Sequence, residues 1–136
     1  MRLSYKVERW SGTLPPNPAM LRSQLVAEGY EVYQWADSPG AVYGLHMHLE
    51  DQSHWIISGS LEVSIESVGT VVLSAGDRDF MPAGCYHSAR VVGDVPVIYL
   101  IGAKRAAGPV PAEAEDDSTE YDSIDDIISS VLNRFH

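Results

Sequence analysis

The chain has 136 residues and a formal net charge of −10, from 19 acidic and 9 basic side chains. This length allows one domain with a substantial apolar core. The excess of acid argues against a nucleic-acid partner, because such binding depends on Lys and Arg side chains that neutralise phosphates. No apolar run approaches the length needed to span a membrane, so we expect no membrane partner.

The cysteine content and the N-terminus both bear on the compartment. A single cysteine, Cys85, rules out an internal disulfide framework and fits a reducing environment. The first residues, MRLSYKVERW, lack the basic and then apolar layout of a signal peptide. We therefore expect a cytoplasmic protein.

The N-terminal part of the chain predicts one short helix between two strands. Residues 1–10 alternate weakly, which is typical of an edge strand. Asn17-Pro18 predicts a helix start, because Asn caps a helix and Pro suits its first turn, and Gly29 predicts the end of that helix. Residues 30–37, YEVYQWAD, predict the next strand.

The central part of the chain is rich in short β-strand signals separated by turn residues. The predicted strands are 42–48, 52–58, 61–66, 70–73, 79–81, 87–92 and 95–101. This spacing is typical of a β-sandwich or barrel and not of an α/β fold. Gly59-Ser60 suits a two-residue hairpin, although this Gly equally suits a bulge. Residues 95–101 are apolar on both faces, so we expect their second face to meet another element or a second subunit.

The C-terminal part of the chain has a different character. Residues 1–105 form the predicted β-barrel domain, and residues 106–122 form a Pro- and acid-rich linker that cannot bury enough apolar surface to order itself. Residues 113–126 hold eight acidic side chains and no basic one. Residues 123–136 predict an amphipathic helix, because their apolar positions recur at spacings of three and four. Those positions are Ile124, Ile127, Ile128, Val131, Leu132 and Phe135.

This helix has two open interpretations. It docks back on the barrel or on a neighbouring subunit, which is the interpretation we favour, or it is a detachable peptide that binds another protein. Its single apolar face and the doubly apolar residues 95–101 together lead us to expect a homodimer.

A cluster of histidines predicts a metal site. His46 and His48 lie two residues apart, so both rings leave the same face of an extended strand. Gln52 follows a short polar turn, and His87 stands in a second motif, PAGCYHSA. An isolated His-x-His pair is more often a core or surface pair, but this combination can converge on one ion. Imidazole suits Zn, Cu, Fe or Ni, and a mixed nitrogen and oxygen set also admits Mn.

The spacing of these residues resembles that of the single-domain cupins. The first cupin motif is Gly, five residues, His-x-His, three or four residues, Glu, six residues and Gly. Its intervals are matched here by Gly40, His46, His48, Gln52 and Gly59. The second motif is Gly, five residues, Pro-x-Gly, two residues, His, three residues and Asn. Its first four positions are matched by Gly76, Pro82, Gly84 and His87. The resemblance covers roughly residues 30–102.

The resemblance implies a small antiparallel β-barrel of jelly-roll type that holds a divalent transition metal, such as Fe, Mn, Ni or Zn. Carried over position by position, its ligands are His46, His48, Gln52 and His87. The chain departs from the motifs twice, with Gln52 in place of Glu and Val91 in place of Asn. A neutral amide leaves the metal its full charge, so we expect weaker binding and stronger acidification of bound water.

His54 is the candidate catalytic residue. It lies two positions beyond Gln52, so on a regular strand its ring points to the same interior face. We expect it to act as a general base or a substrate contact, with direct ligation or a contact to a ligand as weaker alternatives. The competing interpretation is an interior histidine that is hydrogen-bonded to the backbone.

Other residues are weaker candidates. Aromatic side chains that could line a pocket, although core packing is their default, are Trp35, Tyr43, Trp55 and Tyr99. Arg78 and Arg90 could bind a carboxylate, but strand parity turns Arg90 away from His87 and predicts a surface ion pair. Cys85 could contact the metal. Glu50 and Asp51 are expected to be solvated in their turn.

Two functions remain open. The first is a metal-dependent enzyme acting on a small molecule, with either dioxygenase-like chemistry or lyase or isomerase chemistry in which His54 moves the proton. The second is a non-enzymatic module that binds or senses a small ligand through a structural or vestigial metal site. The motifs do not choose between them, because one fold supports many chemistries.

Overall fold

The computed structural model describes residues 4–108. Most of the predicted linker and the whole helix predicted for residues 123–136 lie outside the described residues. The helix of the described part is α1 (Pro18–Ala27). The strands are β1 (Lys6–Glu8), β2 (Glu31–Asp37), β3 (Val42–His46), β4 (Asp51–Ser58), β5 (Ser60–Ile65), β6 (Gly69–Ser74), β7 (Arg78–Phe80), β8 (His87–Val92) and β9 (Val97–Lys104).

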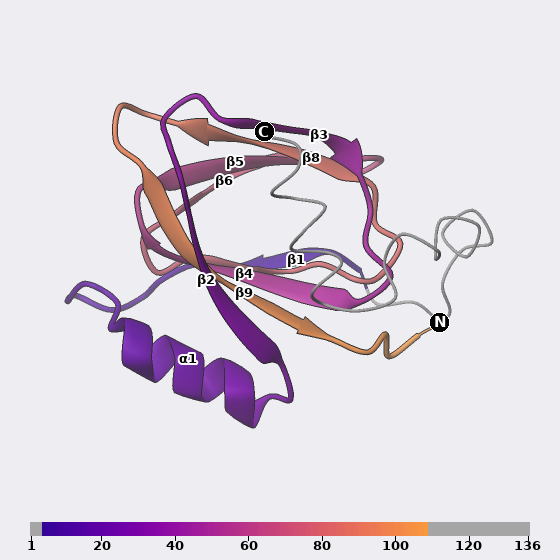
Figure 1. The fold of residues 1–136 in the computed structure, drawn as a ribbon, viewed down its shortest axis with the longest axis horizontal. Coiled ribbons are helices and arrows are strands. Elements are labelled where there is room, and N and C mark those ends of the chain that lie inside the picture. The colour runs from indigo at the N-terminus through magenta and orange to yellow at the C-terminus, as the bar shows by residue number, and fades with distance from the viewer. Residues whose placement is uncertain (1–3, 109–136) are drawn as a thin grey trace.

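The strands form two antiparallel sheets that face each other (Figure 1). The five-stranded sheet has the order β1-β7-β4-β9-β2, and the four-stranded sheet has the order β3-β8-β5-β6. This arrangement confirms the all-β fold expected from the strand pattern and the jelly roll that the resemblance to the cupins implies. β1 lies at an edge, as its weak alternation predicts.

The core lies between the sheets and follows from residue alternation. Leu61, Val63 and Ile65 of β5 are buried, whereas Glu62 and Ser64 between them are only half-buried. Successive side chains of a strand point to opposite faces, so this pattern fits a sheet with one face in the core and one in water.

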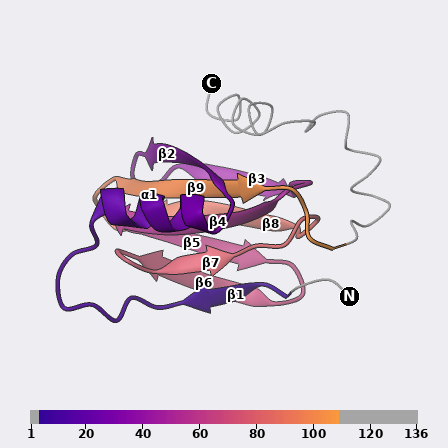
Figure 2. The same cartoon turned by 90° about the horizontal axis from the view of Figure 1, so that it is seen from below.

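Helix α1 covers the other face of the five-stranded sheet, where it lies over β9 and β4 (Figure 2). The side chain of Asn17 accepts hydrogen bonds from the backbone N–H groups of Ala19 and Met20, which caps the helix as predicted. Leu25 of the helix packs in one cluster with Leu100 of β9, and both are fully buried. The second apolar face of residues 95–101 is therefore covered within the chain and gives no argument for a dimer.

The connections around Gly59 differ from the expectation. β3 and β5 belong to the four-stranded sheet, whereas β4 between them belongs to the five-stranded sheet. The hairpin expected at Gly59-Ser60 is therefore wrong, and the chain crosses there from one sheet to the other. Gly59 has a φ of 79°, and a Cβ at this position would lie 2.3 Å from the carbonyl oxygen of Pro96. The crossing thus needs glycine both for its backbone conformation and for space.

Candidate metal centre

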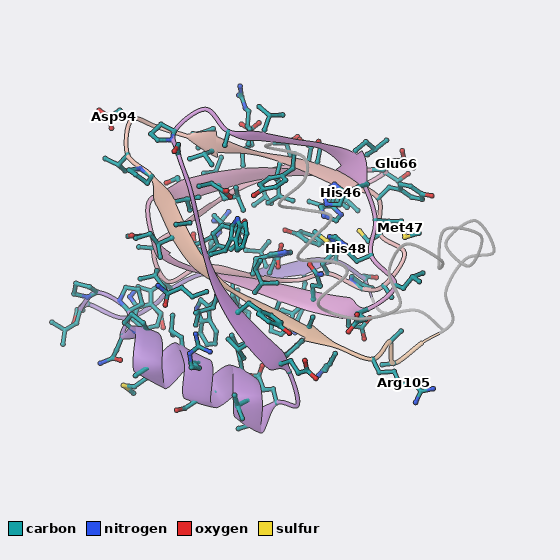
Figure 3. The ribbon with its side chains drawn as sticks, viewed as in Figure 1. His46, Met47, His48, Glu66, Asp94 and Arg105 are labelled. Carbon is teal, nitrogen blue, oxygen red and sulfur yellow. The ribbon has the colours of Figure 1, made fainter. Side chains whose placement is uncertain are left out.

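Three histidines converge near one end of the space between the sheets. His46 ends β3, His87 begins β8, and His48 lies in the connection from β3 to β4. One ring nitrogen of each lies within 4.8 Å of the others; His48 and His87 are buried, and His46 is 9% exposed. His46 and His48 lie at the opposite end of the barrel from Asp94 (Figure 3). Such a cluster of nitrogen donors can hold a metal ion.

The path of the backbone through this cluster is less regular than the expected strand 42–48. β3 ends at His46, which pairs with His87, and its register shifts between Tyr43 and His46. The prediction that His46 and His48 share one regular strand is therefore wrong. His48 is held instead by its carbonyl oxygen, which accepts a hydrogen bond of 2.7 Å from the N–H group of Gly84. The rigid turn of the second motif thus anchors the first.

Backbone contacts orient two of the rings. His46 Nδ1 lies 2.6 Å from the carbonyl oxygen of Gly44, and His87 Nδ1 lies 2.9 Å from that of Cys85. Since a carbonyl oxygen only accepts, each Nδ1 carries the hydrogen, and the lone pair of each ring is on Nε2. This is the tautomer that a metal-binding histidine needs, because its other nitrogen then donates to a neighbouring group. The bond from His87 to the backbone carbonyl group of Cys85 places Cys85 beside the site.

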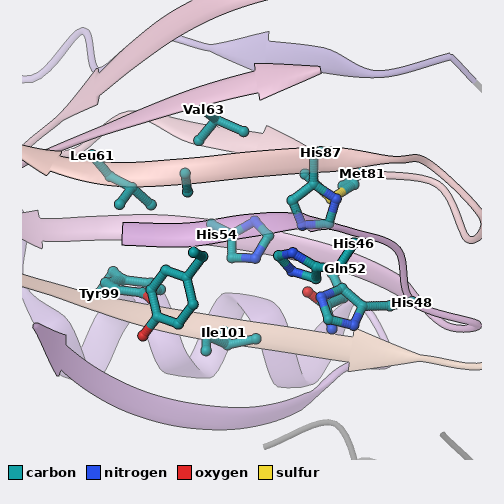
Figure 4. A pocket seen from close by; sticks show the side chains of 12 residues that line it. His46, His48, Gln52, His54, Leu61, Val63, Met81, His87, Tyr99 and Ile101 are labelled. Carbon is teal, nitrogen blue, oxygen red and sulfur yellow. The ribbon is translucent and has the colours of Figure 1, made fainter. Parts of the chain in front are cut away.

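Gln52 reaches the same cavity from the opposite sheet. Gln52 is the second residue of β4 and is only 2% exposed. Its backbone exchanges two hydrogen bonds with that of Met81. Figure 4 shows its amide beside His46 and His48. The chain therefore brings together all four side chains that the motif spacing picked as ligands, although they converge across the barrel and not within one sheet.

The cavity between these groups is small and largely apolar. It encloses about 40 Å³, which is room for a few water-sized groups. Its apolar wall is formed by Leu61, Val63, Met81, Ala89 and Ile101. A wall of this kind lowers the local dielectric and strengthens the interaction of any charge with the polar groups beside it.

His54 also faces this cavity, between Tyr99 and the three histidines (Figure 4). Its Nδ1 lies 2.9 Å from Oδ1 of Asp79, which also accepts the backbone N–H of His54 at 2.8 Å. Oδ2 of Asp79 accepts a hydrogen bond of 3.0 Å from the hydroxyl of Tyr5. The alternative of a histidine bonded to the backbone is wrong, because the partner of the ring is a carboxylate.

Two opposing effects act on the pKa of His54. Burial lowers it, because a desolvated imidazolium is unfavourable, but the charge of Asp79 and its hydrogen bond outweigh burial and hold the pKa above its ordinary value. Asp79 has no exposed surface. Sequence reasoning missed it as a functional residue, and its only signal was an acidic residue within a short predicted strand.

The far side of the cavity is closed by a network around Asp37. The hydroxyl groups of Tyr43 and Tyr99 donate to this carboxylate at 2.8 Å and 3.2 Å, and the indole N–H of Trp35 donates to it at 3.1 Å. Burial and the neighbouring carboxylate raise the pKa of both tyrosines, so both hydroxyls stay protonated. Tyr43 and Tyr99 line the cavity, as two of the four aromatic candidates.

The two arginine candidates do not line the cavity. Arg90 forms an ion pair with Glu62 at 2.8 Å on the outer face of its sheet, which confirms the surface pair predicted from parity. Arg78 is 1% exposed and lies between the rings of Trp55 and Phe80, at 4.2 Å from each ring centroid. Trp55 therefore packs against a cation and takes no part in the cavity wall.

The turn between β3 and β4 is less solvated than expected. Asp51 is only 8% exposed, and its carboxylate accepts the backbone N–H groups of Ala83 at 2.8 Å and Ala107 at 3.0 Å. Glu50 is half-buried, and burial raises the pKa of its carboxyl group. The predicted solvation is wrong for Asp51, because this residue ties the turn to two segments far away in the sequence.

Comparison with known proteins identifies the family. Residues 34–101, half of the chain, match the family model of the cupin domain. The chain belongs to the cupin family. No curated protein matches the chain. In the described part of this cupin, no helix is long and apolar enough to cross a membrane.

Several solved structures are similar to this cupin. A structure from the DMSP lyases RdDddP and RnDddQII has a TM-score of 0.53 and 27% identity, over 60% of this chain and 40% of that one. The DMSP lyase DddQ from Ruegeria pomeroyi DSS-3 has a TM-score of 0.52 and 25% identity, over 61% and 42%. A mutant of Bacillus subtilis oxalate decarboxylase OxdC has a TM-score of 0.50 and 25% identity, over 55% and 21%. The match thus spans less than half of each of these longer proteins.

Proposed function

We propose that this cupin is a metal-dependent lyase that acts on a small molecule. In this proposal His46, His48, Gln52 and His87 hold one divalent ion of Fe, Mn, Ni or Zn, and His54 transfers the proton. The observation that carries the proposal is that the histidine cluster and His54, with its carboxylate partner, open on one cavity.

The donor set fits such an ion. Nε2 of His46 and of His87 carries the lone pair, because each Nδ1 donates to a backbone carbonyl group. Gln52 adds an amide oxygen, which is a neutral ligand. A bound ion supplies Lewis-acid polarisation of a carbonyl or carboxylate group of the substrate.

The proton-transfer role of His54 follows from its partners. Its Nδ1 is bonded to Asp79, which leaves Nε2 for the cavity. A base positioned in this way accepts a proton from the substrate at Nε2, while the buried carboxylate stabilises the positive charge that then spreads over the ring. The apolar wall keeps water away from the transferred proton.

The pairing of a Lewis-acid site with a proton-transfer residue favours a lyase over a dioxygenase. Elimination and decarboxylation both need a proton to be moved, whereas a dioxygenase reaction gives His54 and Asp79 no evident task. The similar structures of DMSP lyases and of an oxalate decarboxylase support the same class of reaction. The small cavity favours a substrate of few atoms.

The experiment loads the purified chain separately with Fe²⁺, Mn²⁺, Ni²⁺ and Zn²⁺. Each sample is incubated with DMSP, with oxalate and with a mixture of small metabolites, and NMR spectra and oxygen uptake are recorded. We expect loss of a substrate without oxygen uptake. We expect His54→Gln to lower the rate by about 10²–10⁴-fold while metal content is unchanged.

Two other outcomes overturn the proposal. Turnover that consumes oxygen indicates a dioxygenase. Full metal occupancy without turnover of any compound indicates a module that only binds a ligand. The two departures from the motifs, at Gln52 and Val91, would then be signs of a site that has lost its catalytic activity.

A further inference from the structure

A second pocket, much larger than the metal cavity, lies where β1, β7, the end of β9 and the C-terminal end of α1 meet. It encloses about 630 Å³, which is in the range of pockets that bind ligands or anchoring side chains. Its apolar surface comes from Tyr30, Phe80, Met81 and Pro82. A pocket of this size has room for an occupant, and the charges in its wall indicate which kind fits.

The two carboxylates in its wall are already paired. Both oxygens of Glu28 accept hydrogen bonds from Arg78, at 3.1 Å and 2.9 Å, and this partner holds the pKa of Glu28 below its ordinary value. Both oxygens of Asp51 accept backbone N–H groups, from Ala83 and Ala107. Glu28 and Asp51 therefore need no positively charged group of the occupant as a partner.

The two lysines in its wall keep spare hydrogen-bond donors. Nζ of Lys104 donates to the carbonyl oxygen of Glu28 at 3.1 Å and lies 4.2 Å from the ring centroid of Tyr30. Nζ of Lys6 lies 4.6 Å from the ring centroid of Phe80 and 3.9 Å from Oε2 of Glu8, in an ion pair whose two side chains are exposed. An ammonium group carries three donors, so both can still bind an anion. The pocket therefore fits an occupant with acidic groups on an apolar body.

The chain itself carries such a segment, and it starts at the pocket. Ala107 lines the pocket, and residues 109–136 follow after Gly108. Residues 113–126 hold eight acidic side chains and no basic one, and six apolar residues recur at helical spacing from Ile124 to Phe135. Only residues 108–112 separate Ala107 from the acidic residues. A segment on so short a tether has an effective concentration at the pocket of the order of millimolar.

We propose that residues 109–136 dock in this second pocket of the same chain, with acidic groups of residues 113–126 on Lys6 and Lys104 and apolar side chains of residues 124–135 on Tyr30 and Phe80. The inference is independent of the proposed function, since it needs neither metal nor substrate. Gln52 and Met81 line both the pocket and the metal cavity, so the docked segment lies against the wall of the metal centre.

Paramagnetic NMR on the full-length chain tests this placement. A nitroxide is attached at position 130 through Ser130→Cys, in a background with Cys85→Ser, and the chain is labelled with ¹⁵N. We expect the amide signals of Tyr30, Phe80 and Ala107 to lose most of their intensity. The amide signals of Val42 and Val72, which belong to the other sheet, should keep theirs. Undiminished signals at the pocket, or losses confined to another surface, overturn the proposal.

Two controls separate the alternatives. Lys6→Gln with Lys104→Gln should restore most of the lost intensity, whereas Arg105→Gln, which removes an exposed charge next to the pocket, should not.

Spin-labelled chain without ¹⁵N is also mixed with ¹⁵N-labelled chain without the spin label. We expect no losses in the mixture. Losses there mean that the segment of a second copy occupies the pocket, which overturns docking within one chain.

Discussion

Nδ1 of His54 and Oδ1 of Asp79 lie 2.9 Å apart, with the carboxylate fully buried and the ring on the wall of the metal cavity. The two residues are 25 positions apart in the sequence and belong to neighbouring strands, β4 and β7. This contact fixes the orientation of the ring and raises the pKa of His54. It also makes His54 the main candidate for proton transfer.

Replacement of Asp79 by Asn should lower the pKa of His54. The amide can keep the hydrogen bond to Nδ1, but it removes the negative charge that raises the pKa, and burial then lowers it. The measurement is an NMR titration of the imidazole in metal-free protein. Asp94→Asn, in an exposed loop, is the matched control and should leave this pKa unchanged. An equal pKa in wild type and Asp79→Asn would show that the contact has no electrostatic role.

The same contact has a consequence for stability. A raised pKa means that the folded state favours the protonated ring, so the stabilisation is complete below the ordinary value of 6.5 and is lost as pH rises through the raised value. The difference in free energy of unfolding between wild type and Asp79→Asn should therefore be largest in mildly acidic solution. Urea denaturation at a series of pH values measures it, and a difference that grows with rising pH contradicts the assignment.

Glu28 should give the opposite pH dependence. Its hydrogen bonds with Arg78 hold its pKa below the ordinary value of 4.5, so this carboxylate stabilises the fold above that pH and the contribution is lost as pH falls through the lowered value. Glu28→Gln should thus be less stable than wild type at neutral pH and should approach it below pH 4.5. Thermal unfolding from neutral to acidic pH is the measurement. A constant difference across this range contradicts the prediction.

Two glycines with similar backbone angles should respond differently to alanine. Gly40 has a φ of 82° with nothing within 4 Å of an added Cβ, whereas at Gly59 the Cβ would meet the Pro96 carbonyl at 2.3 Å. Gly40→Ala should cost about 1–2 kcal/mol of unfolding free energy from backbone strain alone. Gly59→Ala should cost clearly more, because the crossing between the sheets must also shift. Urea denaturation compares them, and equal costs contradict the contact at Pro96.

Much of the fold could be predicted because local signals agree with it. The alternation of Leu61, Val63 and Ile65 marks a strand with one buried face, and Asn17-Pro18 marks the helix start. The sheet to which each strand belongs could not be predicted. A turn signal such as Gly59-Ser60 describes a local reversal, and it carries no information on whether the next strand pairs with the last one or crosses the core.

The sequence predicted which residues form the candidate site better than it predicted how they are arranged in space. Motif spacing selected His46, His48 and His87, which do converge. Nothing local could link Asp79 to His54, because the contact arises only when β7 pairs beside β4. The burial of Asp51 escaped prediction for the same reason, since its partners lie 32 and 56 positions away.

The neutral fourth ligand should limit the affinity for metal. Gln52→Glu replaces the amide with a carboxylate, so its charge should raise the affinity for a divalent ion about tenfold or more, which is about 1.4 kcal/mol. Calorimetric titration with Mn²⁺ or Zn²⁺ measures the change. Gln34→Glu, an exposed position on β2, adds the same charge away from the site and should have little effect. Equal gains in both variants would mean that Gln52 is not a ligand.

The most direct test of the account is the metal content of the full-length chain after loading with Fe²⁺, Mn²⁺, Ni²⁺ or Zn²⁺ and removal of unbound metal. We predict close to one equivalent of at least one of these ions in wild type and in His54→Gln. In His87→Ala, with its fold verified by circular dichroism, we predict almost none. No retained metal in wild type, or full retention in His87→Ala, would contradict a metal centre built on the three histidines.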